Sequence, residues 1–187
     1  MIAYKGFNKD LTCTMGHGRF QYEVGKTYKE NEAKCAKNGF HCVEEPIEVL
    51  SWYKSGDSRY CMVEAGGDIN EDGDERISCT EMTILKEVTL QQIGILECQW
   101  LKDHPWRKES RHVKREFGEA GKDGIVIVRG KHPKAAGQIG STIFLLKEGK
   151  GTNEIEEIGV FQIDGQEYQQ DVYYRVDGRR CRCAKKS

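Results

Sequence analysis

Oxygen-bearing side chains alternate along an acidic stretch that could bind a hard cation. They are Asp68, Asn70, Asp72 and Asp74. Gly73 lies where a calcium-binding loop makes its sharp turn, and such loops gather carboxylate and amide oxygens around one ion. The twelfth position is Cys79, whose thiol does not supply the two carboxylate oxygens required there. We treat the four side chains as weak calcium candidates and assign no metal. The alternative is a solvated hairpin turn.

Cysteine and histidine side chains offer a second possible metal site. Three groupings could place such ligands near a zinc ion: Cys35 with His41 and Cys42, Cys13 with His17, and Cys181 with Cys183. None contains two cysteines separated by two residues, the spacing that lets two thiolates share a tetrahedral ion. Reduced thiols behave as small hydrophobic side chains. We expect that role for most of the eight cysteines, and we predict no cofactor.

A basic segment has the spacing for contact with phosphate groups. Its Lys and Arg residues between positions 107 and 115 recur every three or four residues, so a helix would place most of them on one surface. The predicted nucleic-acid or partner site consists of Trp106, Arg107, Lys108, Arg111, Lys114, Arg115, Lys131, Lys134, Arg179 and Arg180. Trp106 could stack on a base or anchor the segment. The alternative is a solvated helix whose basic side chains pair with Glu109, Glu116 and Glu119.

Charge is unevenly distributed, although the net charge is only −1. The stretch 64–87 holds eight acidic and two basic residues, whereas 102–134 holds ten basic and five acidic residues. Opposite potentials in separate regions favour association with a charged macromolecule. The basic region would meet phosphates, and the acidic region could instead imitate them in the nucleic-acid channel of another protein.

The composition is that of a soluble globular protein. Hydrophobic residues are 37% and charged residues 32% of the 187, with 21 glycines and three prolines, which argues against a disordered chain. No apolar run approaches the roughly 18 residues of a membrane-spanning helix. The N-terminus lacks the pattern of a secretory signal, so we expect a cytoplasmic protein without a membrane partner.

Residues 1–88 are predicted to form an N-terminal α+β lobe. Pro46 suits a first helical turn, and Ile47, Leu50 and Trp52 recur at roughly helical spacing, which predicts a short central helix. The apolar run at 60–63 predicts a buried strand, ended by the glycines at 66 and 67. Other strands are expected at 2–7, 11–15, 20–24 and 77–86.

The remaining chain divides into a helical basic connector, 89–123, and a β-rich C-terminal lobe, 124–187. Thr89 is the expected N-cap of a helix that Pro105 interrupts, after which the helix resumes over 106–117. Buried strands are expected at 125–128 and 141–146, the segment 155–163 follows in the same β-rich lobe, and Asp177-Gly178 predicts a terminal hairpin. The predicted fold class is α+β, with mixed or antiparallel sheets.

Several separated segments carry unusual sequences. They are AYKGFNKDL at 3–11, FQYEVGKTY at 20–28, GFHC at 39–42 and RYC at 59–61 followed by VE at 63–64. Together they resemble an uncharacterised domain that is common in phage, prophage and gut-bacterial proteins, over about the first 95 residues. Segments 140–145 and 163–175 look like the tail of those proteins. Many of these relatives carry a long Ser/Ala/Gly repeat between the two halves, where this chain has its basic segment.

A further resemblance concerns Tyr4, His41 and Glu81. The order of elements around them is similar to that in the NAD-binding core of ADP-ribosyltransferases: a strand, then a strand–helix junction, then an acidic residue late in the domain. This resemblance implies an NAD-binding enzyme in which the three residues are catalytic. The alternative for His41 is a structural residue that caps the helix before Pro46.

We expect a phage or prophage accessory protein that acts by binding rather than catalysis. The resemblance and the charge distribution favour an inhibitor of a host nucleic-acid-targeting defence, similar to anti-CRISPR proteins. Its partner would be a host defence nuclease complex or the nucleic acid of that complex, bound stoichiometrically in the bacterial cytoplasm. The alternatives are the ADP-ribosyltransferase-like enzyme and a phage structural or packaging accessory that binds DNA nonspecifically. The oligomeric state stays open.

Overall fold

The computed structural model describes residues 1–14, 18–35, 37–71, 73 and 76–181. It divides into two compact units, Met1–Ile93 and Gly94–Ser187, each of which is described by itself. The elements of the first unit are β1 Ile2–Asn8, β2 Thr12–Cys13, β3 Phe20–Gln21, β4 Thr27–Lys29, β5 Phe40–Val43, the 3-10 helix η1 Pro46–Glu48, α1 Val49–Trp52, β6 Ser58–Glu71 and β7 Arg76–Val88. Those that follow are α2 Leu90–Asp103, β8 Val113–Ala120, β9 Ile125–Gly137, β10 Thr142–Glu148, β11 Ile155–Gln162, β12 Tyr173–Arg175 and β13 Arg180–Cys181. The predicted α+β class with mixed and antiparallel sheets is confirmed.

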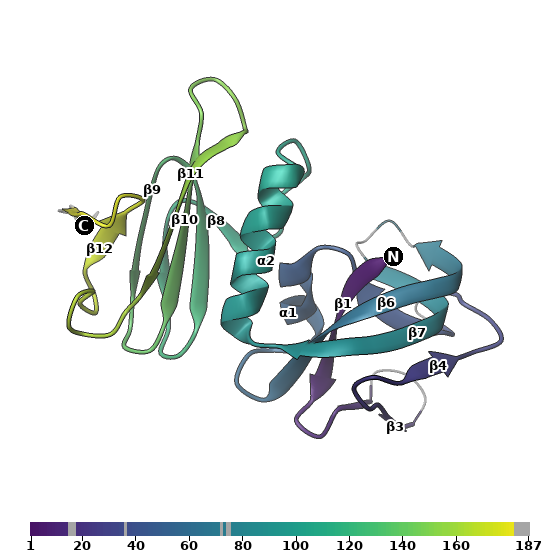
Figure 1. Ribbon diagram of the computed structural model, residues 1–187. Coiled ribbons are helices and arrows are strands. Elements are labelled where there is room, and N and C mark those ends of the chain that lie inside the picture. Colours follow the sequence, from purple (N-terminus) through teal and green to yellow (C-terminus); the bar gives the residue numbers. More distant parts are fainter. Residues whose placement is uncertain (15–17, 36, 72, 74–75, 182–187) are drawn as a thin grey trace. The chain divides into compact units, whose positions relative to one another are not determined.

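The sheet of the first unit closes on itself. Its strand order is β4-β7-β5-β1-β6, and β6 also pairs with β7 along their long hairpin (Figure 1). The strands β6, β1, β5 and β7 therefore form a closed ring, because β7 pairs again with β6. Ala3, Phe7, Cys42, Val63 and Cys79 face the inside of this ring and belong to one buried cluster. Closure is weakest between β1 and β5, where Tyr4 and Val43 form a single pair.

The short central helix occurs where the sequence predicts it. Pro46 stands at the start of η1, where its missing N–H costs no helical hydrogen bond, and α1 follows without a break. Ile47 and Val49 are buried, whereas Leu50 is half-buried and Trp52 is exposed, so the predicted apolar spacing does not coincide with the buried side of the helix. The expected strand end at the glycines is wrong, because β6 continues to Glu71 through a register shift at Gly66. Gly67 has a φ of +66° there, and a bulge accommodates the extra residue.

The helix after Thr89 is confirmed, but its predicted continuation is not. The Thr89 hydroxyl accepts from the Gln92 amide at 3.1 Å, and the Gln92 side chain accepts from the Thr89 amide at 2.8 Å, a reciprocal cap. The helix ends at Asp103, just before Pro105. Residues 113–117, which we expected to be helical, belong to β8. Val113 and Ala120 are the buried positions of that strand, and tertiary packing overrides the weak helical pattern.

The second unit contains a short parallel coil of strands. Phe117 pairs with Lys134 and Ile125 with Thr142, partners that lie seventeen residues apart. Before the register shift between Arg115 and Phe117 the separation is fourteen, as in the pair of Val113 with Ile127. The strands β8 and β9 both bend: β8 bends at Glu116, where φ is +61°, and β9 bends at Gly130, where φ is +159°. The Glu116 carboxylate accepts from the backbone amides that follow Gly130, those of residues 131 and 132, at 2.8 and 3.0 Å, which ties the two bends together.

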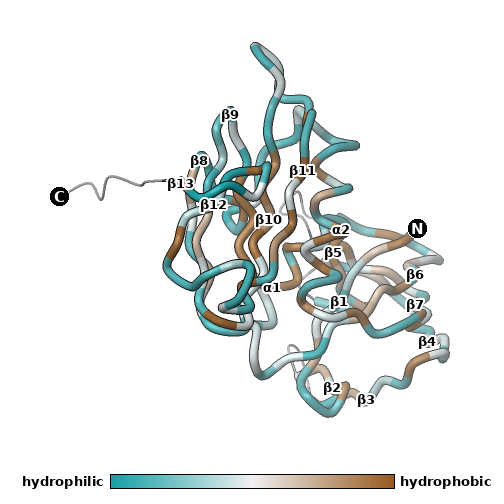
Figure 2. The backbone as a smooth tube through the Cα atoms, turned by 60° about the vertical axis from the view of Figure 1, so that its left-hand side comes forward, coloured by the Kyte–Doolittle hydropathy of each residue, from teal (hydrophilic) through white to brown (hydrophobic). Residues whose placement is uncertain are grey.

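Small residues on one side of the coil pack against branched ones on the other. A Cβ placed on Gly118 would lie 2.8 Å from Val126 and 3.0 Å from Val128, so the coil is tight across its interior. Antiparallel strands complete it, with β11 beside β10 and β12 beside β9. Hydrophobic residues follow one another along β10 (Figure 2), where 143–146 are fully buried.

The predicted terminal hairpin is also present: β12 and β13 pair antiparallel, and Gly178 has a φ of +77° in the turn. Among the helices in the described ranges, none has both the length and the apolar character needed to cross a bilayer.

Candidate functional site

A cavity of about 660 Å³ lies in the first unit, where β1 and β5 separate. Its lining residues all fall between Tyr4 and Arg76 in the sequence, so the site belongs to this unit alone. An antiparallel ladder that begins with Tyr4 opposite Val43 would continue with Lys5 opposite Cys42, but the strands make no further pair. The space that opens between them has the size typical of small-molecule sites, roughly 300–1,000 Å³.

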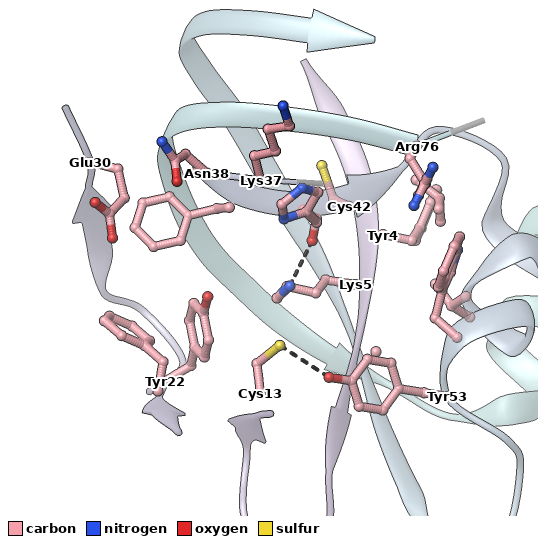
Figure 3. Close-up of a pocket in the computed structure, with 18 of the residues that line it drawn as sticks. Tyr4, Lys5, Cys13, Tyr22, Glu30, Lys37, Asn38, Cys42, Tyr53 and Arg76 are labelled. Carbon is pink, nitrogen blue, oxygen red and sulfur yellow. Dashed lines mark hydrogen bonds between the residues drawn. The ribbon is translucent and has the colours of Figure 1, made fainter. Parts of the chain in front are cut away.

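Gly6 and Tyr53 set one wall of this cavity. The Tyr53 ring packs so closely on β1 that a Cβ at Gly6 would lie 2.6 Å from it, which explains a glycine in the AYKGF segment. The Tyr53 hydroxyl donates to the Cys13 Sγ at 3.1 Å and so ties the end of α1 to β2 (Figure 3). Burial is the main reason why the pKa of Tyr53 is raised above its ordinary value.

A buried lysine lies at the centre of the cavity. Lys5 is only 5% exposed, and its side chain extends from β1 into the space between Tyr22, Cys13 and Cys42 (Figure 3). Its Nζ donates to the His41 carbonyl at 2.6 Å. This carbonyl lies in the part of β5 that has no backbone pairing with β1. The same Nζ lies 5.5 Å from the ring centre of Tyr22, an attractive cation–π distance.

Glu30 and Glu32 line the same cavity, but no carboxylate forms an ion pair with this ammonium in the part of the chain that the structure describes. None of the ion pairs there includes Lys5, and its one hydrogen bond goes to a neutral carbonyl. Lysine is almost never fully buried unless it is paired, because desolvation of an isolated charge is costly. An ammonium has three N–H donors, and the bond to the His41 carbonyl uses one of them.

Aromatic rings surround the cation. Phe20, Tyr22 and Phe40 line the cavity, with the Phe20 ring centre 4.7 Å from that of Tyr22 and 6.0 Å from that of Phe40. The Tyr22 pKa is raised well above its ordinary value because the phenol is buried. At the other side the Arg76 guanidinium lies 4.9 Å from the ring centre of Trp52, and both residues line the cavity.

Two thiols lie at the base of the cavity. Cys42 lines it, and its side chain hydrogen-bonds to that of Cys79 on the neighbouring strand β7. This hydrogen bond, together with burial, raises the Cys42 pKa, while the bond from Cys42 lowers the Cys79 pKa. Both side chains are therefore part of a packed, hydrogen-bonded base rather than exposed nucleophiles.

The structure brings together two of the three residues suggested by the ADP-ribosyltransferase resemblance. Tyr4 and His41 both line the cavity. Glu81 does not line it and instead forms an ion pair with Lys29 at 2.5 Å on the β4 side of the sheet. The capping role considered for His41 is wrong, because the N-cap of η1 is Glu45 and no side chain makes the capping hydrogen bond.

The calcium candidates do not form a loop of converging oxygens where the structure describes them. Asp68 and Asn70 belong to β6, and the Asn70 Oδ1 already accepts from the Cys35 amide at 2.9 Å. Asp72 and Asp74 lie outside the described residues. Over the described ranges, no three His, Cys, Asp or Glu side chains are placed to hold one metal ion. His17 and Cys183, which two zinc groupings need, also lie outside those ranges.

The predicted basic surface is divided by the strand that replaces the expected helix. Lys114 pairs with Val128 and Arg115 with the next residue of β9, and successive side chains of a strand point to opposite faces. Arg115 forms ion pairs with Glu109 at 2.8 Å and Glu148 at 2.6 Å, so its charge is already neutralised. The helical phosphate-binding face predicted over 106–117 is therefore wrong.

The other predicted basic residues lie at separate places in the second unit. Arg107 lies over the Trp100 ring at 5.5 Å, and Arg179 pairs with Asp177 at 3.0 Å. The exposed remainder of the set consists of Trp106, Lys108, Arg111, Lys131 and Arg180. Lys134 differs from these, because it sits on β9 between Phe117 of β8 and Arg175 of β12.

Sequence reasoning missed Lys5, Phe117 and Arg175 as functional candidates. The signal for Lys5 was available, since it alternates with Ala3 and Phe7 and thus shares their buried face. For Phe117 and Arg175 the signal was the spacing of the parallel strands, because a separation of seventeen residues places Phe117 beside Lys134.

A family model for a domain of unknown function, DUF7666, matches residues 1–96, a stretch that contains every residue of the cavity. No curated protein and no solved structure matches the chain. More than half of the 187 residues are covered by the family model, and the predicted membership of an uncharacterised domain family is confirmed. With its cavity inside the matched region, the chain belongs to the DUF7666 family of domains of unknown function.

Proposed function

We propose that the first unit binds a small anionic ligand in the cavity between β1 and β5, with Lys5 as its anchor. The observation that carries this proposal is the buried ammonium of Lys5, which is 5% exposed and has no carboxylate partner among the described residues. A phosphate or carboxylate group of a ligand would supply the missing negative charge and accept hydrogen bonds from the Lys5 ammonium. We propose binding rather than the ADP-ribosyltransferase reaction, because Tyr4 and His41 line the cavity without Glu81.

Calorimetric titration with inorganic pyrophosphate tests this function. We expect the full chain to bind pyrophosphate, and Lys5→Met to bind it at least tenfold more weakly, a loss of about 1.4 kcal/mol or more. The matched control is Lys9→Met, because the Lys9 side chain is 70% exposed and pairs with Asp57 on the surface. The control should keep the affinity of the unmodified chain.

Misfolding would not explain such a loss. Methionine has a similar length and no charge, and replacing a buried charge by an apolar side chain is often neutral or stabilising. Lys5→Met should therefore unfold at the same denaturant concentration as the unmodified chain or at a higher one. Equal pyrophosphate affinity in the two proteins, or no heat with the unmodified chain at millimolar pyrophosphate, would contradict the proposal.

A second candidate function is contact with single-stranded nucleic acid through the second unit. Phe117, Lys134 and Arg175 lie side by side on β8, β9 and β12 and share the outward face of the coil, because their neighbour Gly118 faces the interior. Phe117 is 61% exposed, so its ring is available for stacking beside two cations. Such a surface would serve the inhibitor hypothesis, in which the chain meets the nucleic acid of a defence nuclease complex.

Fluorescence anisotropy with a labelled single-stranded oligothymidine tests this second candidate. Phe117→Ala and Lys134→Glu should each weaken binding about tenfold at low salt, since stacking on an aromatic side chain is worth about 1–3 kcal/mol per base. Lys150→Glu makes the same charge change at an exposed turn and should have little effect. An equal loss in all three variants would point to nonspecific attraction and against this face.

A further inference from the structure

The cavity presents rings as well as charge, and the rings nearest its opening are the exposed ones. Trp52 is 39% exposed and Phe20 is 41% exposed, although both are large apolar side chains that line the cavity. They come from different elements, α1 and β3. Deeper in the cavity Tyr22 is 4% exposed and lies against Lys5. The cavity thus combines a buried lysine with exposed rings, and its lining also includes the acidic residues Glu30 and Glu32.

A second cation accompanies the rings at the opening. The Arg76 guanidinium lies 4.9 Å from the Trp52 ring centre, a stacked arrangement that keeps both groups within the lining. The exposed side chains of Lys37 and Asn38 also line the cavity, at the end of it where β5 begins (Figure 3). Amide and ammonium groups of this kind offer hydrogen bonds to a polar ring or a sugar.

These features select among anionic ligands. An inorganic anion would use only the cations, and it would fill a small part of about 660 Å³. A neutral aromatic compound would leave the Lys5 ammonium without a counter-charge. A ligand that carries both a flat ring and a multiply charged group uses the buried cation and the exposed rings together.

We infer that the ligand is a nucleoside phosphate whose phosphates meet Lys5 and whose base lies against the aromatic opening formed by Phe20 and Trp52. This inference rests on the proposed function, since it assigns a chemical class to the anion bound by Lys5. It makes Trp52 and Phe20 specificity-determining residues, because they distinguish a nucleotide from a free phosphate. Lys5 is the buried cation that anchors the negative charge of the ligand.

Titration of the full chain with ADP, pyrophosphate, adenosine and indole-3-carboxylate at one ionic strength tests the inference. ADP should bind at least tenfold more tightly than each of the other three compounds. Trp52→Ala and Phe20→Ala should each reduce the affinity for ADP toward that for pyrophosphate while leaving pyrophosphate binding unchanged. Trp106→Ala removes a tryptophan that is 71% exposed in the other unit and should change neither affinity.

The possible outcomes separate this inference from the proposed function. Equal affinity for ADP and pyrophosphate, with both lost in Lys5→Met, would overturn the nucleotide assignment and leave the anion site intact. Tighter binding of indole-3-carboxylate than of ADP would also overturn it, in favour of an aromatic carboxylate. Failure of every anion to bind would overturn both. Tenfold tighter ADP binding that survives Trp52→Ala and Phe20→Ala would contradict the assigned position of the base.

Discussion

At the scale of single residues, the first unit buries groups that must stay neutral. Tyr60 and Cys61 are 4% and 0% exposed, and burial raises the pKa of each to about 12 from ordinary values of 10.0 and 9.0. Lys5, Glu45 and Glu48 are ionisable side chains that are also buried in this unit, and Lys5 forms no ion pair among the described residues. A buried amino group without a carboxylate partner is suited to receive an anion from outside the chain.

The buried thiol predicts a loss of stability in alkaline solution. The Cys61 pKa is raised in the folded state, so its contribution is complete below about pH 9 and is lost as the pH rises toward about 12. Each pH unit in that interval costs up to about 1.4 kcal/mol. The free energy of unfolding in urea should therefore fall by about 2 kcal/mol between pH 8 and pH 10.5.

Cys61→Ala is the matched comparison for this prediction. It removes the titrating thiol, so its unfolding free energy should depend less steeply on pH over the same interval, although the absolute value is lowered by the smaller side chain. Parallel pH dependences in the two proteins would show that the Cys61 thiol does not titrate during unfolding and would refute the assignment.

At the scale of elements, a buried ion network holds the bends of the second unit. Arg129 is 1% exposed and Glu148 5% exposed at the side chain, and their Nε and Oε1 atoms lie 2.6 Å apart. The Arg129 guanidinium also donates to the backbone carbonyls of Pro105 and Asn153, at 2.9 and 2.6 Å. It thereby fixes the segment after α2 and the turn after β10 to the central strand β9.

Glu148→Gln should destabilise the second unit strongly. Without the Glu148 carboxylate, the two guanidiniums of Arg115 and Arg129 share Glu109, which lies 3.3 Å from the Arg129 Nε. Removing one partner of a buried pair typically costs 3–5 kcal/mol, so we expect about 3 kcal/mol from urea unfolding. Glu157→Gln makes the same chemical change one strand away, where Glu157 pairs with Lys147 and is 49% exposed. That variant should lose less than about 1 kcal/mol. Comparable losses in both would argue against a structural role for the Arg129 network.

The elements that the sequence predicts correctly are those with strong local signals. Pro46 marks the start of η1, Thr89 caps α2, and Asp177-Gly178 makes the terminal turn. The errors have a common cause in long-range packing. Residues 113–120 have a basic, helix-like spacing, but their structure is set by pairing with residues that lie seventeen or fewer positions further along.

The candidate site is harder to predict because it depends on a missing pair between strands. Tyr4 and His41 attracted attention through their order in the chain, and they do line the cavity. Nothing in the local sequence indicates that β1 and β5 part after Tyr4 and Val43, or that Lys5 fills the gap. Only the alternation with Ala3 and Phe7 places Lys5 on the inner face.

At the scale of the whole molecule, the two units have different candidate roles. The cavity lies entirely in the unit Met1–Ile93. The DUF7666 model covers this unit and the next three residues, 94–96. The outward row of Phe117, Lys134 and Arg175 lies in the other unit. The proposed small-molecule site and the proposed surface for a larger partner thus belong to different units of one chain.

Hydrogen exchange measured on the full chain checks this division. Saturating pyrophosphate should slow amide exchange in peptides that cover β1, β5 and α1, because a ligand that binds only the folded state suppresses local opening around its site. Peptides from β8 to β11 should exchange at unchanged rates. Slowing that is confined to β8–β11 would place the anion site in the second unit and refute the division.

The most direct test of the central claim observes the Lys5 ammonium itself. In a ¹⁵N–¹H spectrum of the lysine side chains, assigned with Lys5→Met, the Lys5 Nζ signal should shift during a pyrophosphate titration with the same Kd as calorimetry gives. The signals of surface lysines such as Lys9 should stay in place. A Lys5 signal that does not move while pyrophosphate binds would contradict the claim that this buried cation receives the ligand's negative charge.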